Sequence, residues 1–480
     1  MRTGNSWKLW AGGVCWILLV SPWAAAQQPK TASSSARNRT SLAITLYNSN
    51  FALVRETRDV NLPAGTVRLA FQDVPSSIEA STVHVEPEPG VEVLDQSYEY
   101  DLLSPDRLLE KYVGKPMTLI FRERVNGTTR DKDVNATLLS TQGPVWKIGD
   151  QIVTGIRPDG YRFPELPGGL YSRPTLVWTL RNERPGARRL SVSYLANQMN
   201  WTADYVLNLT REGTRGSLEG WVTLTNSSGA NFENAKLLLV AGQVHRATSG
   251  PQPFPVMAAR AQAVGGLAEQ FSQQPVGEYH LYTLGRPVDL RNHETKQISL
   301  LSAASVPVTK TYVFEGNSGM FRMAMPIERP TPQGVQVILS FKNDKAAGLG
   351  EPLPAGVVRV YQPDAEGNPI LLGEDRISHT PKDETTRLHI GSAFDVVATR
   401  KQTDFRRIGQ NVYESAFEIT LRNHKATPVT VEVREPVNGS WQVLESNFPA
   451  KKLNAFTLGF DVPVPAGGEA KLTYRVRVTD

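Results

Sequence analysis

Alternation of apolar and polar residues with a period of two is the feature of this chain that most restricts its fold. It runs through residues 66–71, 429–434 and 471–478, where Val, Leu, Phe and Tyr occupy every second position. Only a β-strand keeps such residues on one face, so these segments predict half-buried antiparallel strands.

Helical signals are few. Residues 104–112 predict one short helix, with Ser104 as N-cap, Pro105 at the first helical position and Gly114 just beyond the end. A weaker helical pattern at Val256–Phe271 lies in a segment rich in Ala, Gln, Pro and Gly. We expect this segment, residues 247–276, to be a long exposed insertion.

Two kinds of turn recur along the chain. In the first, a strand ends in Asn, which tolerates positive φ and bonds its own backbone. In the second, Pro-Ala-Gly precedes an outgoing strand, because Pro favours the second position of a type I turn and Gly the fourth. The asparagines are Asn182, Asn226, Asn292, Asn343 and Asn423, and the Pro-Ala-Gly segments are 63–65, 354–356 and 465–467.

Repeated hairpins at this spacing predict an all-β chain of consecutive antiparallel β-sandwich domains of immunoglobulin-like type, with one or two short helices. We expect the last domain to pack Trp441 in its core and to lack the cysteine pair of antibody domains. The expected domains are an N-terminal β domain at 41–175 with its helix near 105–112, a sandwich at 176–305 that carries the insertion 247–276, a sandwich at 306–392, and the immunoglobulin-like sandwich at 393–480.

The N-terminus has the pattern of a signal peptide. Arg2 and Lys8 precede the apolar run Leu9–Val20, and Ala24–Ala26 offers a cleavage site of small residues. We expect residues 1–26 to be removed and 27–40 to form a flexible linker; an uncleaved anchor is the alternative. Cys15 lies inside the apolar run, so a lipoprotein anchor is not predicted.

Charge and cysteine content exclude several functional classes. A formal net charge of +5 over 480 residues gives no reason to expect a nucleic-acid partner. The single cysteine excludes an internal disulfide and a cysteine-based zinc site. No later stretch is long and apolar enough to cross a bilayer. We therefore expect an exported protein of the bacterial periplasm or cell exterior.

Several segments resemble an exported bacterial family classed as a domain of unknown function. The family includes the mucoidy-inhibitor proteins, which carry this domain at their C-terminal end. The resemblance covers most of the chain, roughly Leu42–Asp480, but the coiled coil that precedes the domain in mucoidy inhibitors has no counterpart here. It implies export, a β-rich fold and no assigned activity. The matching segments are 166–170, 173–176, 193–195, 200–205, 220–229, 235–242, 373–375 and 391–396.

Seven residues from these matching segments are the candidate site residues, and we expect them to be structural. Two readings of the aromatic members are open. An aromatic patch beside an acid binds sugars or peptides, whereas core packing with Asp204 capping a turn is the reading we favour. The seven are Trp201, Asp204, Tyr205, Trp221, Asn226, Gly229 and Gly242.

Three further motifs suggest chemistry, and we expect each to be a loop. Asp131–Asn135 begins like a calcium loop but lacks its later Gly and Glu, so it predicts a charged hairpin turn. Gly316–Gly319 has the wrong spacing for a serine-nucleophile turn. Glu374–His379, with Asp383 and Glu384, is the densest cluster of His and carboxylates and is expected to be a solvated loop of mixed charge.

The sequence therefore predicts an exported, non-enzymatic binding or scaffold protein of the bacterial cell envelope. No residue is assigned a catalytic, cofactor-binding or metal-ligating role, and no cofactor is expected. The expected partner is an envelope protein or polysaccharide. A hydrolase of envelope polymers with a loop-built site is one alternative, and capture of a peptide by β-augmentation is another.

Overall fold

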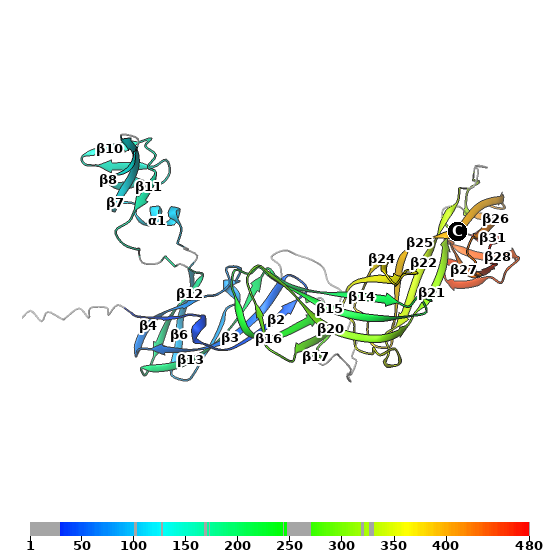
Figure 1. Cartoon of the computed structure of the whole chain (residues 1–480), viewed down its shortest axis with the longest axis horizontal. Coiled ribbons are helices and arrows are strands. Elements are labelled where there is room, and N and C mark those ends of the chain that lie inside the picture. Colours follow the sequence, from blue (N-terminus) through cyan, green and yellow to red (C-terminus); the bar gives the residue numbers. More distant parts are fainter. Residues whose placement is uncertain are drawn as a thin grey trace, which may run out of the picture.

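The structure, a computed structural model, describes residues 29–99, 103–125, 128–167, 170–171, 173–242, 244–246, 270–317, 321–325 and 331–479. The expected signal peptide at 1–26 and residues 247–269 of the expected insertion lie outside this range. The molecule is elongated, and its sheets follow one another along the long axis (Figure 1). It is 67% strand and 4% helix, which confirms the all-β, sandwich-like prediction.

The first unit pairs a four-stranded sheet with part of an eight-stranded sheet. The four-stranded sheet contains, in spatial order, β1 (Lys30–Ser34), β4 (Gly65–Gln72), β12 (Thr175–Asn182) and β6 (Val91–Glu99). The eight-stranded sheet contains β17 (Phe271–Val276), β18 (Tyr279–Leu284), β16 (Phe232–Ala241), β2 (Arg39–Tyr47), β3 (Phe51–Leu62), β13 (Gly186–Asn197) and β5 (His84–Pro87), with β19 (Val288–Leu290) paired to β16.

A five-stranded sheet lies next along the molecule. It contains β20 (Glu294–Pro307), β15 (Arg215–Asn226), β14 (Met199–Leu209), β23 (Gly356–Pro363) and β24 (Pro369–Ile377). Buried residues from this sheet and the two preceding sheets form one continuous apolar core that reaches from Leu42 to Leu388. Short 3-10 helices η1 (Ala36–Asn38), η2 (Ala80–Thr82) and η4 (Lys345–Ala347) join strands of this region.

A nine-stranded sheet forms the C-terminal end and folds around a second core. It contains β28 (Ser440–Ser446), β31 (Glu469–Thr479), β26 (Val412–Asn423), β25 (Thr385–Arg407), β22 (Gln333–Lys342), β21 (Thr309–Glu315), β27 (Val429–Pro436), β30 (Thr457–Val464) and β29 (Lys451–Asn454). Trp441 packs half-buried at the margin of this core, and its indole Nε1 donates to the Ala455 carbonyl at 2.8 Å.

A small module is set off from the main body at the end of two connecting segments (Figure 1). It contains α1 (Pro105–Lys111) and a five-stranded sheet ordered β10 (Gln151–Thr154), β9 (Val145–Ile148), β8 (Thr128–Ser140), β7 (Pro116–Val125) and β11 (Gly160–Arg162). Its core around Trp146 is separate from the others. The predicted helix is confirmed, because Ser104 Oγ accepts from Arg107 N and Pro105 opens the helix.

Strand pairing crosses the expected domain boundaries. β2 runs parallel to β16, which pairs Ala43 with Lys236, and β14 runs parallel to β23, which pairs Ala203 with Gly356. Parallel pairs also join β1 to β4 and β21 to β27, so the sheets are mixed where purely antiparallel ones were expected. Boundaries near 175, 305 and 392 therefore do not separate independent sheets.

Two expected flexible segments are strands where the structure describes them. Lys30–Ser34 lies within the expected linker 27–40, yet it pairs in register with Val67–Phe71. Phe271–Val276 lies at the end of the expected insertion, yet it forms the edge strand β17. Both segments were misassigned because their pairing partners are distant in sequence, and local composition does not reveal such partners.

Four asparagines at strand ends perform the same task in successive units. Each is buried, and each donates its side-chain amide to backbone carbonyls of a neighbouring chain crossover. The acceptors are Pro63 for Asn182, Leu290 for Asn226, Pro381 for Asn343 and Pro465 for Asn423, at 3.0–3.1 Å. The predicted Asn turns thus tie the end of one strand to a second segment of the chain by side-chain hydrogen bonds.

Candidate functional site

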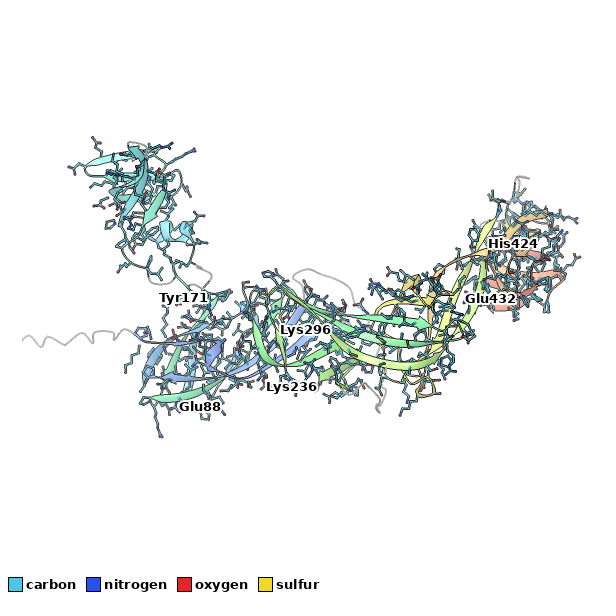
Figure 2. The ribbon with its side chains drawn as sticks, in the orientation of Figure 1. Glu88, Tyr171, Lys236, Lys296, His424 and Glu432 are labelled. Atoms are coloured by element: carbon cyan, nitrogen blue, oxygen red, sulfur yellow. The ribbon has the colours of Figure 1, made fainter. Side chains whose placement is uncertain are left out.

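A polar cleft of about 1040 Å³ opens where β2 and β16 diverge. The two strands pair only from Ala43 and Lys236 onward, and Lys236 is labelled in Figure 2. Before that point Phe232 and Ala235 of β16 pair with β19, which continues the pairing with β18 on the edge of β16 that faces away from β2. Arg39–Leu42 of β2 therefore pair with β3 on one side, and within the described chain no strand pairs with them on the side of the cleft.

The walls of this cleft come from segments far apart in sequence. They include η1, the end of β4, the residues before β12, the loop after β15 and the start of β16. The lining residues are Ser35, Ala36, Arg37, Arg39, Thr40, Ser41, Leu42, Gln72, Asp73, Val74, Arg173, Pro174, Gly229, Ala230, Asn231, Glu233, Asn234 and Asn292.

A buried charge cluster lies behind one wall. Glu56 accepts from Arg39 Nε at 2.7 Å, from Arg58 Nε and Nη2 at 3.1 Å, and from the Tyr194 hydroxyl at 3.0 Å. The Arg58 guanidinium also stacks 3.6 Å from the centre of the Phe71 ring. Burial alone would raise the pKa of Glu56, but the two arginines outweigh burial and lower it. Glu56 is therefore ionised at neutral pH.

Asp73 and Arg173 form a second charged element of the cleft. Arg173 Nη1 lies 2.5 Å from Asp73 Oδ1, and the Ala36 backbone N–H donates to Asp73 Oδ2 at 3.0 Å. Burial raises the pKa of Asp73, but the bonds from Arg173 and Ala36 outweigh that effect and lower it. Asp73 is thus an ionised, fully engaged carboxylate.

The loop after β15 forms the opposite wall and contains two of the predicted residues. Asn226 Oδ1 accepts from Ser228 N and Oγ at 3.1 and 2.8 Å, which shapes the turn. Gly229 has φ +89°, and a Cβ there would lie 2.1 Å from Ser76 Oγ. Only glycine fits that approach, so Asn226 and Gly229 position the wall of the cleft.

The structure divides the expected aromatic patch between two faces of one sheet. Trp201 and Tyr205 point into the core, where Trp201 Nε1 donates to Val240 O at 3.2 Å and the Tyr205 hydroxyl to Pro354 O at 2.8 Å. Asp204 and Trp221 are half-buried, in register with each other, on the other face. Strand alternation thus prevents the four residues from forming one patch.

Asp204 does not cap a turn, which corrects the expectation. It lies within β14, where its carboxylate accepts from Thr223 Oγ1 at 3.1 Å and from Arg359 Nη1 at 3.2 Å. Gly242 follows β16 with φ +135°, and a Cβ there would meet the Tyr279 ring at 2.6 Å. Both residues lie away from the cleft lining.

One motif expected to be a loop is a strand, and a second is a strand in its first part, whereas His379, Asp383 and Glu384 lie in the connection between β24 and β25. Asp131–Asn135 lies within β8 and pairs with Thr118–Arg122 of β7, so it is not a hairpin turn. Glu374–Arg376 lies within β24 opposite β23, and Asp375 Oδ2 accepts from His389 N at 2.7 Å. Charged side chains on an exposed strand face look like a loop in sequence. Of Gly316–Gly319, residues 318 and 319 lie outside the described part.

A second polar cluster adjoins the segment before β23. His379 Nδ1 accepts from Ala355 N at 3.1 Å, and burial lowers the pKa of both His379 and His280. Glu351 is buried, its Oε1 has no partner in the described chain, and burial raises its pKa. None of these three residues lines the cleft.

Arg39, Glu56 and Arg58 were missed by the sequence reading, although a signal for two of them exists. Val54, Glu56, Arg58 and Val60 occupy alternate positions of one strand and are all buried. When two residues of opposite charge occupy positions that the alternation assigns to the buried face of a strand, they indicate a buried ion pair. Arg39 has no such signal, because its partner is set by pairing of β2 with β3.

The described residues were also searched for metal sites and for membrane-spanning helices. In the described part of the chain, no group of three or more His, Cys, Asp and Glu side chains is placed to hold a metal ion. No helix among those described is long and apolar enough to span a membrane.

Comparison with known proteins identifies a family. No curated protein matches the chain. Residues 190–479 match the family described as Domain of unknown function (DUF4139), which is more than half of the chain and includes Trp201, Asn226 and the loop that walls the cleft. Residues 42–189, where resemblance was also expected, precede the matched range. The chain therefore belongs to the DUF4139 family.

Proposed function

We propose that this protein is an exported, non-enzymatic binding protein of the bacterial cell envelope, and that its cleft captures a polypeptide in extended conformation. The observation that carries the proposal is the open side of β2 at Arg39–Leu42 inside a cleft of about 1040 Å³. An unpaired strand side offers backbone donors and acceptors to an added strand. This is peptide capture by β-augmentation.

The chemistry of the lining favours binding over hydrolysis. Its carboxylates are Asp73, which is ionised and held by Arg173, and Glu233 on the opposite wall. General acid catalysis needs a carboxyl that keeps its proton near neutral pH, and Asp73 does not. No histidine belongs to the lining set, all of which lies in the described chain.

The same lining favours a peptide over a polysaccharide. Sugar-binding sites usually offer aromatic rings for stacking, and none of the lining residues is aromatic. The cleft instead presents amides and hydroxyls beside an open strand. Such groups suit the regularly spaced N–H and C=O groups of an extended backbone.

The proposed export and envelope location do not depend on the cleft but on the sequence. The sequence begins with a pattern typical of a signal peptide, and several segments resemble the mucoidy-inhibitor proteins. The elongated shape suits a scaffold, because it separates the cleft from the C-terminal unit (Figure 1).

Selection from a random peptide display library on the immobilised full chain tests the proposal. Ser41→Trp fills the cleft from an exposed position of β2, and Thr202→Trp places the same side chain on exposed β14 as a control. We expect peptides whose binding is lost with S41W and kept with T202W. Hydrogen exchange at Arg39–Leu42 should slow when such a peptide is added. Peptides that bind both variants equally, or no selected peptide at all, would refute the proposal.

A further inference from the structure

We infer that the captured peptide carries an acidic side chain, and that this carboxylate pairs with Arg39 in the cleft. The inference rests on the proposed function and specifies the ligand of the same site. It follows from a charge imbalance in the wall formed by β2 and β3.

Glu56 cannot satisfy both arginines beside it. Its Oε2 accepts from Arg39 Nε and Arg58 Nε, and its Oε1 accepts from Arg58 Nη2 and Tyr194. A carboxylate offers about four acceptor positions, so these four bonds use its capacity. Arg58 Nη1 is satisfied by the carbonyls of Gln72 and Ser34 at 2.7 and 3.3 Å. The donor left over belongs to Arg39.

Arg39 Nη2 is buried and has no hydrogen-bond partner in the described chain. The Arg39 side chain is 8% exposed, compared with 0% for Glu56, and it lines the cleft. A buried donor without an acceptor is costly, and a buried cation without a full counter-charge is more so. Bulk water does not reach this atom. If the Arg39 guanidinium rotates toward the cleft, a bound ligand can supply an acceptor for Nη2. A negatively charged acceptor would remove both the cost of the unpaired donor and the cost of the uncompensated positive charge.

The charges around the cleft leave an excess of one cation. Arg37, Arg39, Arg58 and Arg173 face Glu56, Asp73 and Glu233 in the wall and lining. Asp73 is held by Arg173, and Glu233 lies on the β16 side of the cleft. No ion pair of Arg37 occurs within the described residues, and its position in η1 places it on the cleft lining. It adds a second, exposed cation for an incoming anion.

A carboxylate on an extended peptide fits this site for geometric reasons. Guanidinium and carboxylate form paired, charge-assisted hydrogen bonds. Side chains of a strand added beside β2 alternate between faces, so one acidic residue at a fixed position of the peptide points toward Arg39. Specificity for one acidic position is therefore expected, rather than a general preference for negative charge.

Peptides selected on the full chain should share Asp or Glu at one position. For the best such peptide, Glu→Gln should weaken binding to the wild-type protein roughly tenfold or more. Against the Arg39→Gln variant the same change should have little effect, because the partner is gone. Arg55→Gln, on the exposed face of β3, is the matched control and should keep the full difference.

The outcomes separate the two proposals. Cleft-dependent peptides without a shared acidic position, or an equal Glu→Gln loss with Arg39→Gln, overturn this inference and leave peptide capture standing. Failure to select any cleft-dependent peptide overturns both. Arg39→Gln removes the unsatisfied donor but also one of the two cations bound to Glu56, so its thermal unfolding midpoint should fall. A single cooperative transition well above the temperature of the binding assay shows that the comparison uses folded protein.

Discussion

The side-chain amide of Asn182 donates a hydrogen bond to the carbonyl of Pro63, 119 residues earlier in the chain, at 3.0 Å. Asn423 does the same to Pro465 at 3.0 Å in the C-terminal unit. In both places an Asn that ends one strand reaches a Pro-Ala-Gly crossover that begins another. At these two places the two recurring turn types of the sequence are therefore joined by a side-chain hydrogen bond.

Replacement of Asn423 tests the importance of this device. Asn423→Ala removes the donor to the Thr427 and Pro465 carbonyls and the acceptor for Lys425 N. Because the site is buried, we expect the C-terminal unit to lose roughly 1–3 kcal/mol of stability. Urea unfolding followed by hydrogen exchange in β26 and β31 measures the loss. Gln410→Ala, at an exposed loop position of the same unit, should leave exchange unchanged.

Gly229→Ala should distort the wall of the cleft. The new Cβ would overlap Ser76 Oγ, and the positive φ disfavours any side chain, so we expect a destabilisation of roughly 1–3 kcal/mol. Thermal unfolding measures it. Adding Ser76→Gly to this variant removes the nearest atoms and should recover part of the loss. Gly277→Ala, also at positive φ but in open space, separates backbone strain from overlap.

Acid should destabilise the first unit through Glu56. Its pKa in the folded state is lowered from 4.5, so the stability it contributes is present above that value and is lost as the pH falls below it. Glu56→Gln should lower stability at neutral pH and flatten the loss on acidification. Unfolding curves between about pH 3 and 7, read from hydrogen exchange in β3 and β13, test this.

Glu435 supplies the opposite case in the C-terminal unit. It is also fully buried, and among the described residues one arginine, Arg400, binds it at 2.8 and 3.1 Å. Burial there outweighs Arg400 and raises the pKa of Glu435. Because the pKa of Glu435 is higher in the folded than in the unfolded state, its contribution to the free energy of unfolding is full below the unfolded-state pKa. That contribution is lost as the pH rises through the folded-state pKa. An acid response of Glu435→Gln identical to that of Glu56→Gln would contradict this account.

The small module at residues 103–171 should be separable. Its two ends meet, since Leu103 N donates to Tyr171 O at 2.9 Å, and Tyr171 is labelled at the junction in Figure 2. Its core shares no residue with the other two. Replacing it by a short Gly-Ser linker should leave hydrogen exchange in β4 and β12 unchanged. Loss of cooperative unfolding in the main body would show that the module is part of that core.

The sequence allowed the local features to be predicted and left the long-range ones open. The helix after Ser104, the Asn turns and the strands with clear period-two alternation depend on neighbouring residues, and these were recognised. Strands with exposed, charged or low-complexity sequences, such as Asp131–Asn135 and Phe271–Val276, were not. Pairing of Ala43 with Lys236 depends on residues far apart, so the sheets and the cleft they form could not be derived. The buried charge of Arg58 was hidden for another reason, because period-two reading assigns charged residues to the solvent face.

The 23-residue strand β25 has a mechanical consequence. It pairs with β22 along its first part and with β26 along its second, both in the nine-stranded sheet. Leu388 lies in one core and Val396 in the other. The paired backbone of β25 thus runs without interruption from one apolar core to the other. Separating the two cores would require breaking the pairing of β25 with β22 or with β26.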